Sequence, residues 1–174
     1  MILRKAQNQD YGYIKKLYRE AFPLYERMPF SFMRRKHEKD KMEILVAESD
    51  STPCALAIPS CFEDMILLNY FAVASDVRGQ GIGSKVISLL AERYSGNRII
   101  IEIEKPDDKK PDTIRRKDFY LRNGFEETGI DIRLAGTPME ILTLGGNVSS
   151  EEYVRIYKSL LGQVFTAAMV RIVK

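Results

Sequence analysis

The sequence contains no tryptophan, one histidine and only two cysteines among its 174 residues. The cysteines are Cys54 and Cys61, and together with a single histidine they cannot supply the usual four-ligand Cys/His zinc site. A disulfide framework is not expected either, because a chain of this length buries enough surface to fold without one. We therefore expect neither a metal ion nor a disulfide.

Long apolar runs and a strong net charge are also missing. No apolar run approaches the roughly 18 residues that a membrane-spanning helix needs, and the N-terminal Met1-Ile2-Leu3-Arg4-Lys5 lacks the apolar region of a signal peptide. The 27 basic and 24 acidic residues give a net charge of +3, too small to predict nucleic-acid binding by itself. The sequence therefore predicts one globular domain over residues 1–174, in the cytoplasm, with no membrane or nucleic-acid partner.

Apolar segments with strand or helix periodicity alternate along the chain, which predicts a mixed α/β fold. Strands are expected at 1–6, 43–48, 54–60, 65–74, 98–104, 125–134 and 139–144. Helices are expected from residue 8 or 10 to 21, around 82–93 and at 113–122, with a short charged helix or loop at 34–41. A capping box from Ser149 to Glu152 predicts a C-terminal helical extension over about 149–174.

The most informative segment is the glycine-rich stretch Arg78-Gly79-Gln80-Gly81-Ile82-Gly83-Ser84, which joins the apolar strand 65–74 to the following helix. The amides of its residues would be the unpaired donors of the first helical turn, where an anion binds readily. Arg78 adds a full positive charge. The segment therefore predicts a cradle for a pyrophosphate, and a glycine-rich turn without a ligand is the alternative.

Two well-known phosphate loops fit this stretch poorly. A P-loop requires Gly-Lys-Ser/Thr, whereas Ser84-Lys85 follows Gly83. The dinucleotide fingerprint G-x-G-x-x-G matches Gly79 and Gly81 but meets Ser84 at its third glycine. The P-loop is excluded and the dinucleotide fingerprint is disfavoured.

The stretch from Val77 to Gly83 resembles the acyl-CoA pyrophosphate loop of the GNAT superfamily of N-acetyltransferases, whose pattern is Gln/Arg-x-x-Gly-x-Gly/Ala. A second element, Phe119-Tyr120-Leu121-Arg122-Asn123-Gly124-Phe125, resembles the family's Phe-Tyr-x-x-x-Gly-Phe signature. The resemblance covers residues 65–125. It implies a central, mostly antiparallel sheet flanked by helices and splayed at the strand before the glycine loop.

The resemblance also implies acetyl-CoA as the acetyl donor and a primary amine of a small molecule or peptide as the acceptor, which attacks the thioester directly. By the same resemblance, backbone groups at the end of the strand would line the pantetheine arm and the loop would hold the pyrophosphate. The residues concerned are Phe71, Ala72 and Val73 for the arm, and Arg78, Gly79, Gln80, Gly81, Ile82, Gly83 and Ser84 for the pyrophosphate.

Direct transfer needs an acid for the departing thiolate and a base for the ammonium proton. Tyr120 stands at the family's position for the acid. By the same resemblance, the base lies early in the strand before the loop or in the strand that follows. Residues 65–69 contain no carboxylate, whereas the following strand offers Glu102 and Glu104, which alternation puts on one face. Glu102 is preferred because its β-branched neighbours would raise its pKa by desolvation. Glu104 and a water chain remain alternatives.

The resemblance places acceptor contacts after the first helix, in the aromatic segment 22–30, where Glu26 and Arg27 could bind an amine or a carboxylate. The two side chains could equally form a surface ion pair. A non-catalytic acyl-CoA-binding sensor remains an alternative to the enzyme, and a homodimer remains open. A nucleic-acid binder using residues 34–41 and 109–117 is disfavoured, because acidic residues interrupt both basic segments.

Overall fold

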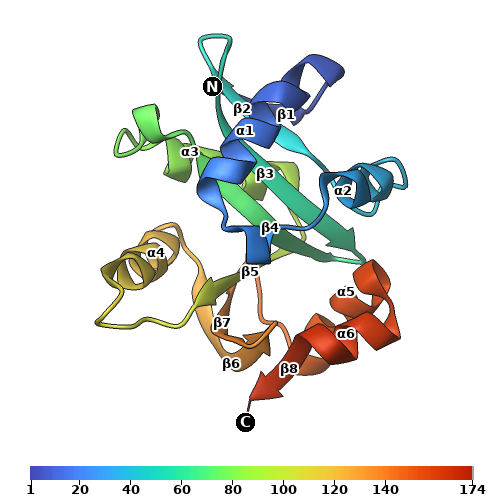
Figure 1. Ribbon diagram of the computed structural model, residues 1–174. Coiled ribbons are helices and arrows are strands. Elements are labelled where there is room, and N and C mark those ends of the chain that lie inside the picture. The colour runs from blue at the N-terminus through green and yellow to red at the C-terminus, as the bar shows by residue number, and fades with distance from the viewer. Residues whose placement is uncertain (174) are drawn as a thin grey trace. The chain divides into compact units, whose positions relative to one another are not determined.

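A computed structural model describes residues 1–173, which form one hydrogen-bonded sheet in the strand order β1-β2-β3-β4-β5-β7-β6-β8 (Figure 1). The sheet is mostly antiparallel and β4 pairs with β5 in parallel, so the predicted mixed α/β fold is confirmed. The strands are β1 Ile2–Lys5, β2 Leu45–Ser49, β3 Thr52–Phe62, β4 Met65–Val73, β5 Arg98–Glu104, β6 Glu126–Leu134, β7 Thr137–Leu144 and β8 Val170–Val173. The helices are α1 Tyr11–Ala21, α2 Phe30–His37, α3 Ile82–Arg93, α4 Pro111–Arg122, α5 Ser150–Leu161 and α6 Gln163–Met169, with 3-10 turns η1 Asn8–Asp10, η2 Leu24–Glu26 and η3 Ser75–Val77.

The chain divides into two compact units. The first unit contains Met1–Cys61 and Leu68–Ser95, and the second contains Phe62–Leu67 and the chain from Gly96 onward. The strand β4 contributes to both, because its first three residues belong to the second unit. The expectation of a single domain over the whole chain stays a prediction.

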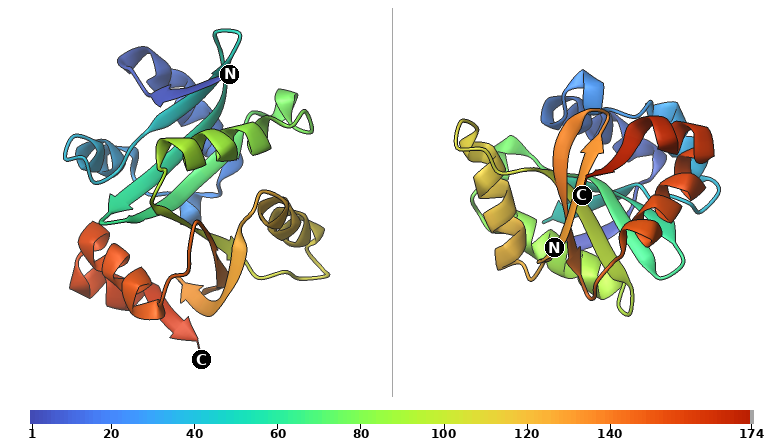
Figure 2. Two further views of the ribbon diagram at one scale, coloured as in Figure 1. Left: turned by 180° about the vertical axis from the view of Figure 1, so that it is seen from behind. Right: turned by 90° about the horizontal axis from the view of Figure 1, so that it is seen from below.

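In the first unit, α1 and α2 cover one face of the strands and α3 covers the other (Figures 1 and 2). The apolar stripe expected for α1 is buried, with Ile14, Leu17 and Tyr18 each at most 4% exposed. Residues 54–60 of β3 are buried without interruption. This is the burial expected of a strand that has helices on both faces.

In the second unit, α4 lies on one side of the strands and α5 with α6 on the other (Figure 2). The first three residues of β4 pair with Arg98–Ile100 of β5. Within residues 1–173 no further pair joins these two strands, although both continue. The hydrogen-bonded pairing of β4 with β5 thus ends at Leu67, and the splay that the resemblance implies at this strand stays a prediction.

The C-terminal segment begins as predicted and ends differently. The Ser149 hydroxyl accepts a hydrogen bond from the Glu152 amide at 3.2 Å, and the Glu152 carboxylate accepts one from the Ser149 amide at 2.9 Å. This reciprocal capping box confirms the predicted start of α5. Gly162 (φ 84°) then ends α5, and after α6 the chain adds β8 to the edge of the sheet beside β6. The extension is therefore not wholly helical.

No helix among residues 1–173 is long and apolar enough to cross a bilayer.

Within the first unit, one carboxylate, that of Glu43, holds the C-terminal end of α3. Arg93 donates to both of its oxygens at 2.9 and 3.1 Å, the Tyr94 hydroxyl donates at 2.5 Å, and the Lys5 ammonium lies 3.1 Å away. Burial alone would raise the pKa of Glu43, but these donors outweigh it and lower the pKa to about 2. The ionised carboxylate therefore stabilises the folded state.

We expect Glu43→Gln to lower the free energy of unfolding by about 2 to 3 kcal/mol at pH 7, because charge-assisted hydrogen bonds are lost. A carboxylate whose pKa is lowered on folding stabilises above its unfolded pKa, here 4.5, and loses that effect as the pH falls toward about 2. Urea unfolding at pH 7, 5, 4 and 3 should show the difference between mutant and wild type shrinking below pH 4.5. Glu92→Gln, a change at an exposed residue of the same helix, is the control and should stay within about 0.5 kcal/mol. A difference that is constant over this pH range would contradict the assignment.

Candidate functional site

The glycine-rich stretch forms the connection between β4 and α3. After β4 ends at Val73, the turn η3 leads to Arg78, and α3 begins at Ile82 with Gly81 as its N-cap residue. Gly79 and Gly81 have φ angles of +78° and +77°, in the left-handed region that glycine adopts without strain. Alternate glycines therefore allow the tight entry into the helix.

A run of six backbone amides is unpaired at this helix start. Of the backbone hydrogen bonds formed within residues 1–173, none is donated by an amide from Gly79 to Ser84, and the first bond into α3 is Lys85 amide to Gly81 carbonyl at 3.1 Å. The helix dipole adds partial positive charge at the same place. A Cβ atom placed on Gly79 or Gly81 would meet nothing within 4 Å, so the space beside the loop is open. These properties fit the pyrophosphate of a nucleotide-bearing ligand.

The side chains around the loop add one available cation. The exposed Arg78 donates its Nε to the Val73 carbonyl at 3.0 Å, which fixes the stem of the guanidinium. No hydrogen bond or ion pair within the described chain uses its two terminal nitrogens. Gln80 donates to the Asp76 carbonyl at 3.4 Å, and Ser84 lies in the first turn of α3. Arg78 thus combines a fixed position with free donors.

The end of β4 leads into this loop. Ala72 is buried, whereas Phe71 and Val73 are partly buried. The Ala74 amide bonds to the Cys54 carbonyl of β3 at 2.9 Å, so β3 holds the strand end in place. The three residues expected to line a pantetheine arm therefore belong to the strand that positions the cradle, and both features lie in the first unit.

Glu26 and Arg27 lie at η2, between α1 and α2. The Arg27 guanidinium donates to the carbonyls of Phe22 at 2.6 Å and Arg19 at 3.2 Å, so part of it holds the backbone of this segment. The Glu26 side chain is exposed, and its carbonyl accepts a hydrogen bond from the Tyr70 hydroxyl at 2.7 Å. An acceptor-binding role for the two residues stays a prediction.

Tyr70 was not singled out by the sequence analysis. Besides donating to Glu26, its hydroxyl accepts the Met28 amide at 2.9 Å, and its ring packs against Tyr18 and Phe22 with centroids 4.8 and 5.0 Å apart. An aromatic residue of β4 thus fixes the segment that carries Glu26 and Arg27. The same strand also contains Phe71 and the polar Asn69, so no sequence signal distinguished Tyr70.

Tyr120 lies near the C-terminal end of α4 in the second unit. Its ring packs edge-on against Phe119 and Phe125, with centroids 5.1 and 5.3 Å away, and the residue is 9% exposed. Burial raises its pKa to about 12, a rise that Arg116 slightly opposes, so the hydroxyl keeps its proton at neutral pH. Within residues 1–173 that hydroxyl has no hydrogen-bond partner. It can therefore donate to a bound group.

Glu102 lies on β5 in the second unit and is partly buried. Its two oxygens accept hydrogen bonds from the Tyr153 hydroxyl at 2.6 Å and the Tyr157 hydroxyl at 3.0 Å. Desolvation raises its pKa, and the two hydrogen bonds act in the opposite direction. The sequence analysis anticipated the direction of this pKa shift and missed both tyrosines. Their spacing of four residues along α5 puts them on one helix face, which was the only available signal.

Glu104 has a different environment from Glu102. Its carboxylate accepts a hydrogen bond at 3.5 Å from Lys110, and its side chain is 23% exposed. The bond to Lys110 makes Glu104 an ordinary ion pair at the strand's end. Which of the two carboxylates acts as a base stays a prediction.

Comparison with known proteins identifies the family. The model of the acetyltransferase (GNAT) domain matches residues 40–127, about half of the chain. The Bacillus subtilis (strain 168) protein named "Putative acetyltransferase YjbC" is 34% identical over 100 residues, which are 53% of this chain and 51% of that protein. The matched region thus spans about half the length of this curated relative.

Solved structures share the fold at low identity. A "Putative acetyltransferase from GNAT family" from Bacteroides thetaiotaomicron has a TM-score of 0.78 at 21% identity and covers 95% of this chain and 99% of its own. The ribosomal-protein-S18-alanine N-acetyltransferase of Escherichia coli has a TM-score of 0.61 at 18% identity. That match covers 86% of this chain and 96% of the Escherichia coli chain. The sheet order, the glycine loop and the family model agree, and the chain belongs to the GNAT family of acetyltransferases.

Proposed function

We propose that this protein transfers an acetyl group from acetyl-CoA to a primary amine of a small molecule or a peptide by direct attack of the amine. The observation that carries the proposal is the run of six unpaired amides from Gly79 to Ser84 beside Arg78. Membership of the GNAT family supports the acyl-transfer class. The cytoplasmic location expected from the sequence stays a prediction.

Acetyl-CoA supplies the acetyl group as a thioester. The loop amides and Arg78 bind the pyrophosphate, and the backbone of 71–73 contacts the pantetheine arm. Glu102 accepts the proton that the ammonium must lose before its nitrogen can attack. Tyr120 donates a proton to the sulfur that departs when the C–S bond breaks. Over one turnover the nitrogen loses two protons: Glu102 passes the first to solvent, and the second, lost after the attack, equals the proton that Tyr120 gives to the thiolate and then regains.

The nature of the acceptor is the part of the proposal that needs a broad test. The Escherichia coli relative is named for a protein alanine as its acceptor. We propose that Glu26 and Arg27 contact the acceptor here, because they lie on an exposed turn whose backbone Tyr70 fixes. A panel of amines should therefore include amino acids, polyamines, aminoglycosides and peptides with free N-termini.

Two measurements on the intact protein test the proposal. Isothermal titration with acetyl-CoA measures binding, and the release of free thiol over the amine panel measures transfer. We expect saturable binding and thiol release that depends on an amine. Binding without thiol release for any amine would indicate an acyl-CoA-binding sensor, and the absence of binding would overturn the cradle.

Gly81→Val is expected to weaken acetyl-CoA binding at least tenfold, which corresponds to about 1.4 kcal/mol. A β-branched residue is strained at φ +77°, and its side chain would enter the open space beside the amides. The measurement is isothermal titration at moderate salt. Gly96→Val is the matched control, since Gly96 has φ +83° and equally open surroundings but lies outside the cradle. Unchanged affinity in a folded Gly81→Val protein would show that the loop does not hold the pyrophosphate.

A further inference from the structure

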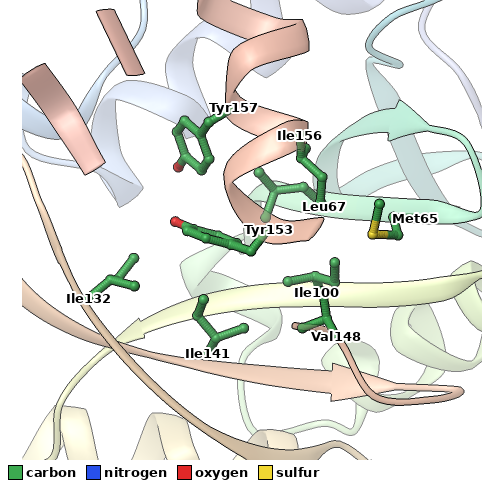
Figure 3. Packing of buried hydrophobic residues seen from close by; sticks show 9 residues of the cluster. All are labelled: Met65, Leu67, Ile100, Ile132, Ile141, Val148, Tyr153, Ile156 and Tyr157. Atoms are coloured by element: carbon green, nitrogen blue, oxygen red, sulfur yellow. The ribbon is translucent and has the colours of Figure 1, made fainter. Parts of the chain in front are cut away.

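The carboxylate of Glu102 is held by two tyrosines of the helix α5. Tyr153 donates to Oε1 at 2.6 Å and Tyr157 donates to Oε2 at 3.0 Å, so each oxygen has its own hydroxyl. Figure 3 shows both hydroxyl oxygens turned to the same side of α5. The two rings pack against each other with centroids 5.3 Å apart, and neither residue is more than 3% exposed. The arrangement fixes both rotation and position of the carboxylate.

The surroundings of this group are otherwise apolar. Leu67 of β4, Ile132 of β6 and Ile141 of β7 belong to the buried cluster that contains both tyrosines (Figure 3). No other titratable group within residues 1–173 contributes to the pKa shift of Glu102. Glu104, farther along β5, is bonded to Lys110 instead. The protonation of Glu102 therefore depends on its burial and on the two hydroxyls.

We propose that Tyr153 and Tyr157 are positioning residues that orient the Glu102 carboxylate and stabilise its ionised form for proton abstraction. The inference rests on the proposed function and assigns a catalytic purpose to α5, a helix that lies outside the region matched by the family model. A hydroxyl that donates to a carboxylate favours the charged form, whereas an apolar cluster favours the neutral form. The two hydroxyls thus oppose the desolvation that raises the pKa of Glu102.

The test replaces each hydroxyl while keeping its ring, in Tyr153→Phe and Tyr157→Phe. A charge-assisted hydrogen bond lost from the carboxylate should raise the pKa of Glu102 by about one unit. The acidic limb of kcat/KM should move upward by the same amount. At pH values on the acidic limb, kcat/KM of each variant should be about tenfold lower than that of the wild type. The difference should vanish at higher pH, where Glu102 is ionised in both proteins. Damage that only loosens the fold would lower the rate at every pH.

A second readout needs no turnover. The carboxyl carbon of Glu102, followed by NMR with ¹³C-labelled glutamate, reports its titration directly, with Glu102→Gln used to assign the signal. Both variants should titrate at higher pH than the wild type. Tyr94→Phe is the matched control, because it removes a hydroxyl from a different carboxylate, that of Glu43. We expect it to leave the titration of Glu102 and the acidic limb unchanged.

The outcomes separate this inference from the proposed function. An unchanged Glu102 titration in both tyrosine variants would overturn the inference even if the wild type acetylates amines. A shifted titration together with a shifted acidic limb supports it. If the wild type acetylates no amine of the panel, the proposed function fails and the inference about catalysis fails with it, whatever the titration shows. A shifted titration beside an unmoved acidic limb would show that the tyrosines act on Glu102 but not on the reaction.

Discussion

Tyr120→Phe is expected to lower kcat by about 100- to 10,000-fold, the usual cost of losing a general acid. The change removes one hydroxyl that has no partner within residues 1–173 and keeps the ring that packs between Phe119 and Phe125. The protein should therefore fold and bind acetyl-CoA with nearly unchanged affinity. Steady-state thiol release measures the first effect and isothermal titration measures the second.

Tyr13→Phe provides the matched control for this experiment. The Tyr13 hydroxyl is also buried and lacks a hydrogen-bond partner, and burial raises its pKa to about 12 as well. The chemical change is the same, but Tyr13 has no assigned role in the reaction. We expect its turnover to stay within a few-fold of wild type. Equal losses of binding and turnover in Tyr120→Phe, or no loss at all, would argue against the acid role.

Glu102→Gln is expected to reduce kcat/KM by about 100-fold or more at neutral pH. Glutamine keeps the shape of the side chain and can still accept a hydrogen bond from Tyr153 or Tyr157, but it cannot take up the ammonium proton. The pH profile identifies the titrating group. If Glu102 is the base, the acidic limb of kcat/KM should disappear in the mutant. A limb that persists unchanged reports the ionisation of the amine substrate instead.

Glu104→Gln is the control for this choice. Its side chain follows on the same strand face, two residues or about 6 to 7 Å along β5, and it is bonded to Lys110 rather than to tyrosines. We expect activity close to that of the wild type. A severe loss in Glu104→Gln together with an active Glu102→Gln would show that the farther carboxylate is the base.

The elements with local signals were predicted closely. The strand 98–104 is found at those residues, because the β-branched run Ile99–Ile101 favours an extended backbone. The start of α5 follows from the Ser149 capping box. The charged helix or loop expected at 34–41 is instead the helix α2 at Phe30–His37, which begins after Pro29 and buries Met33. Its basic residues form the last turn, where they interact favourably with the helix dipole.

Which parts of the candidate site could be predicted also depends on whether their interactions are local or distant in sequence. The glycine loop could be predicted because its spacing, its helix and its arginine are contiguous in sequence. The hydrogen bonds to Glu102 could not, because Tyr153 and Tyr157 lie 51 and 55 residues away along the chain. No periodicity in the sequence encodes which strand faces which helix. The break at Gly162 and the added strand β8 were missed for the same reason, since β8 gains its hydrogen bonds from β6.

The position of α5 near the end of the chain has a consequence for biosynthesis. The second unit packs Tyr153, Ile156 and Tyr157 of α5 against residues of strands that are synthesised earlier. While the ribosome is still adding these residues, the apolar face that α5 will cover has no helix to bury it. The second unit can therefore complete its core only after α5 has been synthesised, and until then its nascent strands present an uncovered apolar face that favours aggregation.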